Sequence, residues 1–319
     1  MNKEDKILLE VNNLSTSFFT EDGEVKAVRG VSLNVREGET LGFVGESGCG
    51  KSVTALSIMK LIPSPGRIMG GEVYYKGKDL LRLTDKEIRD IRGKEIALIF
   101  QEPLTSLNPV FNVGNQIVEA IRIHQNVGKK EAVKRAIAML ESVGIPEPQR
   151  RIKDYPHQLS GGMRQRVMIA MALSCNPNLL IADEPTTALD VTIQAQILEL
   201  MESIQKKRNM AMIFITHDLG IISETVDNVA VMYCGKIVEY TSTKTLIKEP
   251  LHPYTKALLE SIPVPDQDNH QPLKDIKGSV PNLLNLPKGC TFCDRCEKAE
   301  KDCKNIEPKL VEVKKGHWV

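Results

Sequence analysis

One short segment restricts the possible folds of this chain more than any other feature of its sequence. An apolar run, TLGFVG, leads into a glycine-rich stretch that opens a helical pattern. In such a strand–loop–helix unit, glycines let backbone N–H groups approach phosphate oxygens, and the helix start favours their negative charge. The alternative is a glycine-rich turn that binds no ligand. Against it, a lysine and a serine follow the last glycine, at the positions from which they can reach the phosphates and Mg²⁺. The sequence therefore predicts a phosphate-binding loop (P-loop) with Lys51 on the β- and γ-phosphates and Ser52 on Mg²⁺. Its residues are Gly45, Glu46, Ser47, Gly48, Cys49, Gly50, Lys51 and Ser52.

The surrounding sequence pattern predicts an α/β fold. Short β-type runs separated by turn signals fill roughly the first hundred residues, and apolar residues then recur at helical spacing over residues 113–174. After this stretch, NLLIAD and AMIFITH have the composition of buried parallel strands, each followed by a helical segment. We therefore expect a helical insertion at about residues 102–175. Near Thr84 the run T-D-K-E predicts a capping box closed by Glu87, with a helix beginning at Asp85.

Two adjacent carboxylates follow the predicted strand that begins at Leu179. Asp183 stands at the strand tip, where it is expected to bind Mg²⁺ directly or through water. Glu184 comes next and is placed to polarise an attacking water, so Glu184 is the predicted catalytic base. Taken alone, an Asp-Glu pair at a strand end can equally be a solvated turn.

Charge and hydropathy exclude several classes of protein. Lys and Arg number 42 against 41 Asp and Glu, giving a net charge of +1, so no strong field attracts nucleic acid. No apolar run approaches the ~18–20 residues that cross a bilayer. The start, MNKEDKILLE, lacks the apolar region of a secretory signal. We expect a cytosolic chain without a nucleic-acid partner.

A further segment, LSGGMRQR at residues 159–166, precedes the Asp-Glu pair. Ser160, Gly161 and Gly162 would form a second helix N-terminus that offers a hydroxyl and bare amides to phosphate. Together with the P-loop, this segment resembles the signature of ATP-binding cassette (ABC) proteins. The resemblance implies a P-loop ATPase of the ABC nucleotide-binding type, in which this helix start contacts the γ-phosphate held by the opposite subunit.

The same resemblance assigns roles to isolated residues elsewhere in the chain. Gln101 matches the Q-loop glutamine, expected near the catalytic water and Mg²⁺, and His217 matches the switch histidine. The segment Ala188-Leu189-Asp190 matches the D-loop, with Asp190 expected at the nucleotide. Phe18 looks like the aromatic residue that stacks on adenine, although Phe19 stands beside it. Without this context, Gln101 would be interpreted as a surface amide and His217 as a strand-end histidine.

Two other segments narrow the resemblance to ATPase subunits of oligopeptide and dipeptide importers: QEPLTSLNP at residues 101–109 and LHPYT at residues 251–255. This implies an ATPase on the cytoplasmic face of the membrane that acts with a second ATPase subunit, two permease subunits and, indirectly, an extracytoplasmic peptide-binding protein. A groove around residues 101–113 is expected to receive a short permease helix. The predicted nucleotide-binding domain spans 1–262, and 263–319 hold a linker and a cysteine-rich region.

Other functions remain possible at this stage. Close relatives of these importers carry nickel, opines or oligosaccharides, and the ATPase sequence has little access to the choice of solute. A soluble ABC ATPase of DNA repair or of ribosomes usually has two cassettes or a long coiled-coil insertion, which this chain lacks. A P-loop kinase would need an acceptor pocket and gives no reason for LSGGMRQR.

Four cysteines crowd near the end of the chain: Cys290, Cys293, Cys296 and Cys303. In a reducing cytosol such a set suggests a metal site, and four thiolates suit either Zn²⁺ or a cubane iron–sulfur cluster. Resemblance to the peptide importers favours [4Fe–4S], and unligated thiols are the third possibility. In the resembled proteins a further cysteine commonly follows a His-x-Val stretch. Here the sequence reads His317-Trp318-Val319, so Cys293 is the candidate fourth ligand unless the given chain ends short of the usual one.

Overall fold

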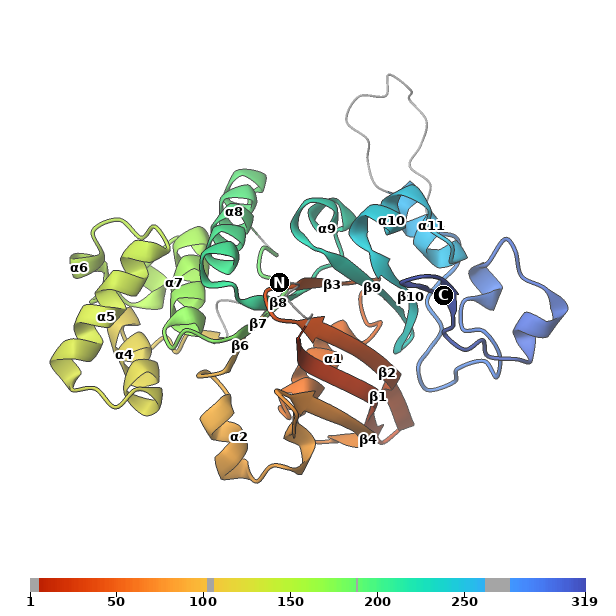
Figure 1. Cartoon of the computed structure of the whole chain (residues 1–319), viewed down its shortest axis with the longest axis horizontal. Coiled ribbons are helices and arrows are strands. Elements are labelled where there is room, and N and C mark those ends of the chain that lie inside the picture. Colours follow the sequence, from red (N-terminus) through yellow and green to blue (C-terminus); the bar gives the residue numbers. More distant parts are fainter. Residues whose placement is uncertain (1–5, 102–105, 188, 262–275) are drawn as a thin grey trace, which may run out of the picture. The chain divides into compact units, whose positions relative to one another are not determined.

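The computed structural model describes residues 6–101, 106–187, 189–261 and 276–319 and divides the chain into two compact units. One unit contains the P-loop and comprises Ile7–Val35, Thr40–Leu81 and Ile215–Val319; we call it the P-loop unit. The other contains the LSGGMRQR segment and comprises Met1–Lys6, Arg36–Glu39 and Arg82–Phe214; we call it the signature unit. Figure 1 shows the elements of both, and each unit is described by itself.

The P-loop unit contains two sets of strands. In the first, the order is β2-β1-β4-β5, and β1 pairs antiparallel with β4 from Leu9↔Tyr75 to Phe18↔Gly66. In the second, the order is β11-β12-β10-β9-β3, with β3 and β9 parallel. The strands are β1 (Ile7–Thr20), β2 (Gly23–Arg36), β3 (Thr40–Val44), β4 (Gly66–Tyr75), β5 (Lys78–Asp79), β9 (Asn228–Tyr233), β10 (Lys236–Ser242), β11 (Glu312–Lys314) and β12 (His317–Trp318).

Helices connect and cover these strands. Every residue of β3 is buried, as expected for a parallel strand covered on both faces, so the P-loop that follows starts from a fixed point. The helices are α1 (Lys51–Ile58), α9 (Leu219–Thr225), α10 (Thr243–Lys248) and α11 (Pro253–Glu260), with 3₁₀ turns η1 (Leu80–Arg82), η3 (Cys293–Arg295) and η4 (Lys301–Lys304).

The signature unit has three strands in the order β8-β7-β6. Strands β6 and β7 run parallel, from Ile96↔Leu179 to Ile99↔Ala182, so their carboxyl ends lie at the same edge. All residues of β7 and β8 are buried. The elements are α2 (Asp85–Ile91), β6 (Ile96–Ile99), α4 (Val113–His124), α5 (Lys129–Ser142), α6 (Pro148–Arg151), η2 (Pro156–Gln158), α7 (Gly161–Leu173), β7 (Leu179–Asp183), α8 (Val191–Arg208) and β8 (Ala211–Ile215).

Helices α4 to α7 lie between β6 and β7 in the chain and gather in one group (Figure 1). Helix α4 packs against α5, and both contact α7; each of the three has buried apolar residues, among them Ile117, Ala136 and Ile169. The helical pattern predicted for residues 113–174 is therefore confirmed. The boundaries of a separate helical subdomain, about 102–175, and the division at residue 262 stay predictions. The segments 102–105 and 262–275 lie outside the described residues.

The predicted start of α2 is also confirmed. Thr84 is the N-cap, its side chain accepts a hydrogen bond from the Glu87 N–H, and Glu87 accepts from the Thr84 N–H at 2.9 Å. None of the helices within the part of the chain that the structure describes is long and apolar enough to cross a bilayer.

Candidate functional site

The P-loop adopts a conformation that only glycine tolerates at several positions. Gly45, Gly48 and Gly50 have φ of 153°, 77° and 106°. A Cβ atom on Gly45 would lie 2.2 Å from the carbonyl oxygen of Met232, so β9 leaves no room for a side chain there. The glycine spacing is thus explained by backbone geometry: the chain turns sharply from β3 into α1.

Lys51, the first residue of α1, turns its side chain back over the loop. Its ammonium donates hydrogen bonds to the carbonyl oxygens of Gly45 at 2.7 Å and Glu46 at 3.1 Å. The residue is only 5% exposed. A phosphate oxygen is a stronger hydrogen-bond acceptor than a carbonyl oxygen, so the position of this ammonium inside a glycine-rich loop is compatible with the predicted phosphate contact. Ser52 follows in the first turn of α1, half-buried.

The other residues predicted in this unit lie on different elements. Phe18 is half-buried in β1 and faces Gly66 across the strand pair, whereas Phe19 is exposed beneath the Arg67 guanidinium, 5.6 Å from the ring centroid. Neither ring is fully buried, and which one meets adenine stays a prediction. His217 is exposed next to Asp218, the N-cap of α9.

In the signature unit, the parallel pairing of β6 and β7 brings two predicted residues together. Gln101 follows β6 and Glu184 follows β7, and Gln101 Nε2 donates to Glu184 Oε2 at 2.9 Å. The hydroxyl of Thr187 donates to the same oxygen at 2.9 Å. Glu184 has φ of 45°, in the left-handed region. Asp183 beside it is buried at the strand tip. The carboxylate of Glu184 is therefore held in one orientation by two donors.

The LSGGMRQR segment forms a helix start, as predicted. Ser160 is exposed and is the N-cap of α7, with its hydroxyl oxygen accepting from Met163 N–H at 3.3 Å. Gly161 and Gly162 make the first turn. Gly162 also has a packing reason, since a Cβ there would lie 2.8 Å from Ile193 of α8. The helix start and its amides are thus available to an anion at an exposed position.

One structural role was missed by sequence reasoning. Asp190, assigned to the nucleotide, is the N-cap of α8 and accepts from Ile193 N–H at 2.9 Å. An aspartate just before a helix is a strong N-cap signal that could have revealed this. Ala188, the first residue of the predicted D-loop, lies outside the described residues, as do residues 102–105 of QEPLTSLNP.

The four-cysteine loop does not fit the metal site predicted for it. Cys290 N–H donates to the Cys303 carbonyl at 2.8 Å, which closes the loop, and burial raises the pKa of Cys290 and Cys293, with neighbouring thiols adding to the effect. Cys303 Sγ instead accepts from Glu300 N–H at 3.5 Å within a 3₁₀ turn. Among the residues that the structure describes, no three His, Cys, Asp or Glu side chains form a group that could hold a metal ion. Neither the iron–sulfur cluster nor its zinc alternative on Cys290, Cys293, Cys296 and Cys303 is supported.

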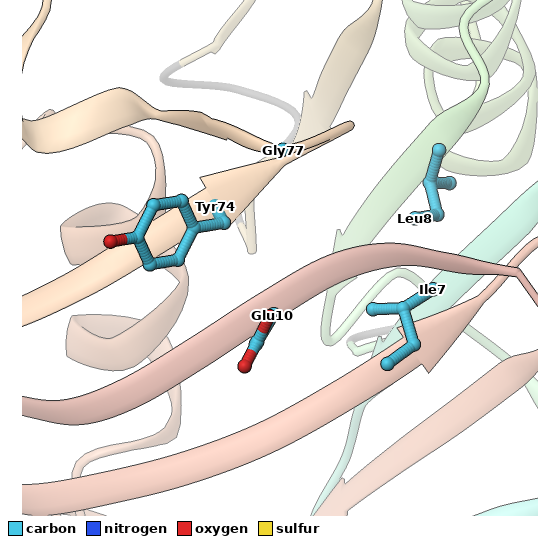
Figure 2. Close-up of a pocket in the computed structure, with 5 residues that line it drawn as sticks. All are labelled: Ile7, Leu8, Glu10, Tyr74 and Gly77. Atoms are coloured by element: carbon cyan, nitrogen blue, oxygen red, sulfur yellow. The ribbon is translucent and has the colours of Figure 1, made fainter.

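A small pocket of about 280 Å³ on the P-loop unit lies away from these residues. Figure 2 shows its lining side chains on β1, β4 and the following turn: Ile7, Leu8, Glu10, Tyr74 and Gly77. Its charged lining residue is an acid, Glu10, which disfavours a triphosphate. The pocket contains none of the predicted site residues.

Comparison with known proteins identifies the type of site. The family described as ABC transporter matches residues 28–187, and the family described as oligopeptide/dipeptide transporter, C-terminal region, matches residues 238–303. The oligopeptide transport ATP-binding protein AppD of Bacillus subtilis is 55% identical over 313 residues, covering 98% of this chain and 95% of AppD. The dipeptide transport ATP-binding protein DppD of the same organism is 53% identical over 302 residues, covering 94% and 90%.

Solved structures agree with this match. A dimeric structure of the ATP-binding cassette MJ0796, in a post-hydrolysis state with ADP and Pi, superposes with a TM-score of 0.67 at 27% identity. The superposition covers 74% of this chain and 98% of that one. The fold is therefore shared with a protein whose structure was solved with bound nucleotide.

Proposed function

The chain belongs to the ABC transporter family as an ATP-hydrolysing subunit of the oligopeptide/dipeptide type, and on this premise we propose how it works. ATP binding closes two such subunits face to face, and hydrolysis reopens them, which drives uptake of peptides through permease subunits at the cytoplasmic face of the membrane. The second ATPase subunit is either an identical copy or a sister chain.

The observation that carries this proposal is the hydrogen-bonded pair of Gln101 and Glu184. A carboxylate held by two donors at the end of a strand is positioned to orient a water molecule and take its proton. Bound Mg²⁺ would neutralise charge on the phosphates, and Ser52, Asp183 and Gln101 are the residues predicted to hold it. Lys51 binds the phosphates, and His217 is the predicted switch residue near the γ-phosphate.

Closure of a dimer is supported by the exposed start of α7. Ser160 and the amides of Gly161 and Gly162 form an anion-binding helix end in a helix of thirteen residues. We propose that this end contacts the triphosphate bound to the P-loop of the other subunit. The similar cassette MJ0796 is described as dimeric with ADP and Pi.

A permease contact is supported by apolar side chains between β6 and α4. Val110 is 71% exposed and Phe111 is 51% exposed, next to the N-cap of α4. Large exposed apolar side chains that lie together on a soluble subunit favour a protein partner. We propose that they receive a short helix of the permease, and that the peptide-binding protein acts only through that permease.

The decisive experiment measures dimerisation in a hydrolysis-deficient background. Glu184→Gln should keep ATP bound, so sedimentation with MgATP should reveal a dimer, either alone or with the sister subunit. Ser160→Arg in the same background should still bind a fluorescent ATP analogue but remain monomeric. A Glu184→Gln protein that stays monomeric with MgATP and its sister subunit would refute face-to-face closure, whereas loss of ATP binding in Lys51→Ala checks the P-loop assignment separately.

Metal binding by the four cysteines and the identity of the transported solute are separate questions from the ATPase role. The spacing of the four cysteines predicted a metal site, but the described structure does not support one, and metal analysis with a visible absorption spectrum of the purified protein tests this directly. Transport of nickel, an opine or an oligosaccharide instead of peptides would be revealed by the permease and binding protein that co-purify with the chain.

A further inference from the structure

The second residue of the P-loop, Glu46, is held from outside the loop by the C-terminal region. Arg295 of η3 donates two parallel hydrogen bonds to its carboxylate, from Nη1 to Oε2 at 2.7 Å and from Nη2 to Oε1 at 2.9 Å. The Arg295 side chain is 4% exposed. A bidentate pair between an arginine and a carboxylate combines high strength with a fixed geometry, so Glu46 has little freedom.

The guanidinium of Arg295 is itself fixed by its surroundings. Its Nε donates to the Lys277 carbonyl at 3.0 Å, and Nη1 donates to the Tyr233 hydroxyl at 3.3 Å. The group lies 5.8 Å from the ring centroid of Phe292. The hydrogen bonds to Glu46 raise the pKa of Arg295 above its ordinary value, so the charge is permanent. The arginine therefore acts as a rigid support.

A second residue holds the backbone of the same loop position. Glu46 N–H donates to the hydroxyl of Tyr254 at 2.8 Å. Tyr254 lies in α11, is fully buried, and packs against Tyr233 with ring centroids 4.6 Å apart. Because Lys51 donates to the carbonyl oxygen of Glu46, displacement of Glu46 also moves the partner of the phosphate-binding ammonium.

Arg295 can neutralise the negative charge of Glu46, which would otherwise oppose the binding of ATP. An unpaired carboxylate in a loop that receives a triphosphate would repel it, because like charges at short range disfavour each other. We propose that Arg295 and Tyr254 form a P-loop brace, in which Arg295 neutralises and orients Glu46 and Tyr254 fixes its backbone, so that the C-terminal region positions the loop for ATP. The brace rests on the proposed ATPase function and adds positioning residues outside the ATP-binding motifs.

Substituting each partner of the ion pair in turn tests the brace, because the two substitutions should change the Kd for MgATP differently. Arg295→Gln and Glu46→Gln both break the ion pair, and a purely structural pair would make them equivalent. The brace predicts that Arg295→Gln raises the Kd for a fluorescent MgATP analogue about tenfold, because the Glu46 carboxylate is then left unneutralised in the loop that receives the triphosphate. Glu46→Gln should instead lower that Kd, since Arg295 then adds a positive charge without its carboxylate partner. The double variant should return to within about threefold of the wild type, because both charges are absent.

A matched control comes from another ion pair of the same region. Glu307 accepts from Arg29 and from Lys236, each at 2.6 Å, and so joins the C-terminal region to β2 and β10 without touching the P-loop. Glu307→Gln should leave the Kd and the ATPase kcat and KM unchanged. In Arg295→Gln, KM for ATP should rise with Kd while kcat changes by less than about twofold, because the chemistry depends on Glu184.

Tyr254→Phe keeps the buried ring and removes only the acceptor of Glu46 N–H. It should raise the Kd a few-fold, and it decides the question if Arg295→Gln does not fold. The brace is wrong if Arg295→Gln folds and keeps the wild-type Kd, if Glu46→Gln weakens binding as much as Arg295→Gln does, or if Tyr254→Phe has no effect. A wild-type chain that binds no ATP would refute the proposed function instead, and the two failures are thereby distinct.

Discussion

His252 makes the stability of the P-loop unit depend on pH in a way that a single substitution can isolate. The residue is the N-cap of α11, and its Nδ1 accepts a hydrogen bond from Tyr254 N–H at 3.1 Å. The ring lies 6.0 Å from that of Phe292. Burial lowers its pKa from 6.5 to about 4, and the nearby carboxylate of Glu239 only partly opposes this. The folded protein therefore holds His252 neutral, with Nδ1 as an acceptor.

The direction and the size of the effect follow from this pKa. In the unfolded chain a histidine takes up its proton near pH 6.5, while in the folded chain His252 does so only near pH 4. Between these values the unfolded state binds more protons, so acidification favours unfolding. The free energy of unfolding should fall by up to about 1.4 kcal/mol per pH unit, or about 3 kcal/mol over the whole window. Above pH 6.5 the contribution of His252 is complete and constant.

His252→Asn is the matched variant, because asparagine keeps an N-cap acceptor and does not titrate. Urea unfolding can be followed by the fluorescence of Trp318, the single tryptophan, which lies in β12 opposite Tyr240. Other titrating groups contribute equally to both proteins. The difference in unfolding free energy between wild type and variant should therefore change with pH by up to about 1.4 kcal/mol per unit below pH 6.5. Parallel curves for the two proteins would refute the reasoning.

Three further predictions concern other parts of the chain. Gly45→Ala should lower the free energy of unfolding by about 3 kcal/mol, because its Cβ would lie 2.2 Å from the Met232 carbonyl oxygen. A Cβ on Gly48 meets nothing within 4 Å, so Gly48→Ala should lower it by only about 1 kcal/mol. Equal losses for the two variants in urea unfolding would contradict this. Glu184→Gln should lower kcat at least about 10²-fold with ATP affinity nearly unchanged, and a smaller loss in a phosphate-release assay would argue against a general base. Thr84→Ala should destabilise α2 by about 1 kcal/mol, visible as faster amide hydrogen exchange in that helix.

Local features were predictable from the sequence because they depend on neighbours in the chain. The P-loop glycines, the start of α1 and the capping box at Thr84 each involve residues within a few positions of one another. The buried strands β7 and β8 were equally clear, because short apolar runs with turn signals at both ends admit few other structures.

Contacts between distant residues were not predictable from residue patterns. Gln101 and Glu184 are 83 positions apart, and only the pairing of β6 with β7 makes them neighbours; their common role was implied by family resemblance alone. Arg295 and Glu46 are 249 positions apart, and no residue pattern near either one indicates that they pair. The cysteine spacing likewise specified the ligand type but not the path of the loop, which decides whether the thiols converge.

Glu184 has a left-handed backbone conformation, which places its side chain at the carboxyl end of β7. A residue with φ of 45° is unfavourable for any side chain with a Cβ, by about 1–2 kcal/mol, and glycine would fit there at no such cost. The chain places a carboxylate there instead and offsets the strain with hydrogen bonds from Gln101 and Thr187. Both donors meet the same oxygen, so the backbone and the hydrogen bonds together orient the carboxylate, which is what the proposed role as general base requires.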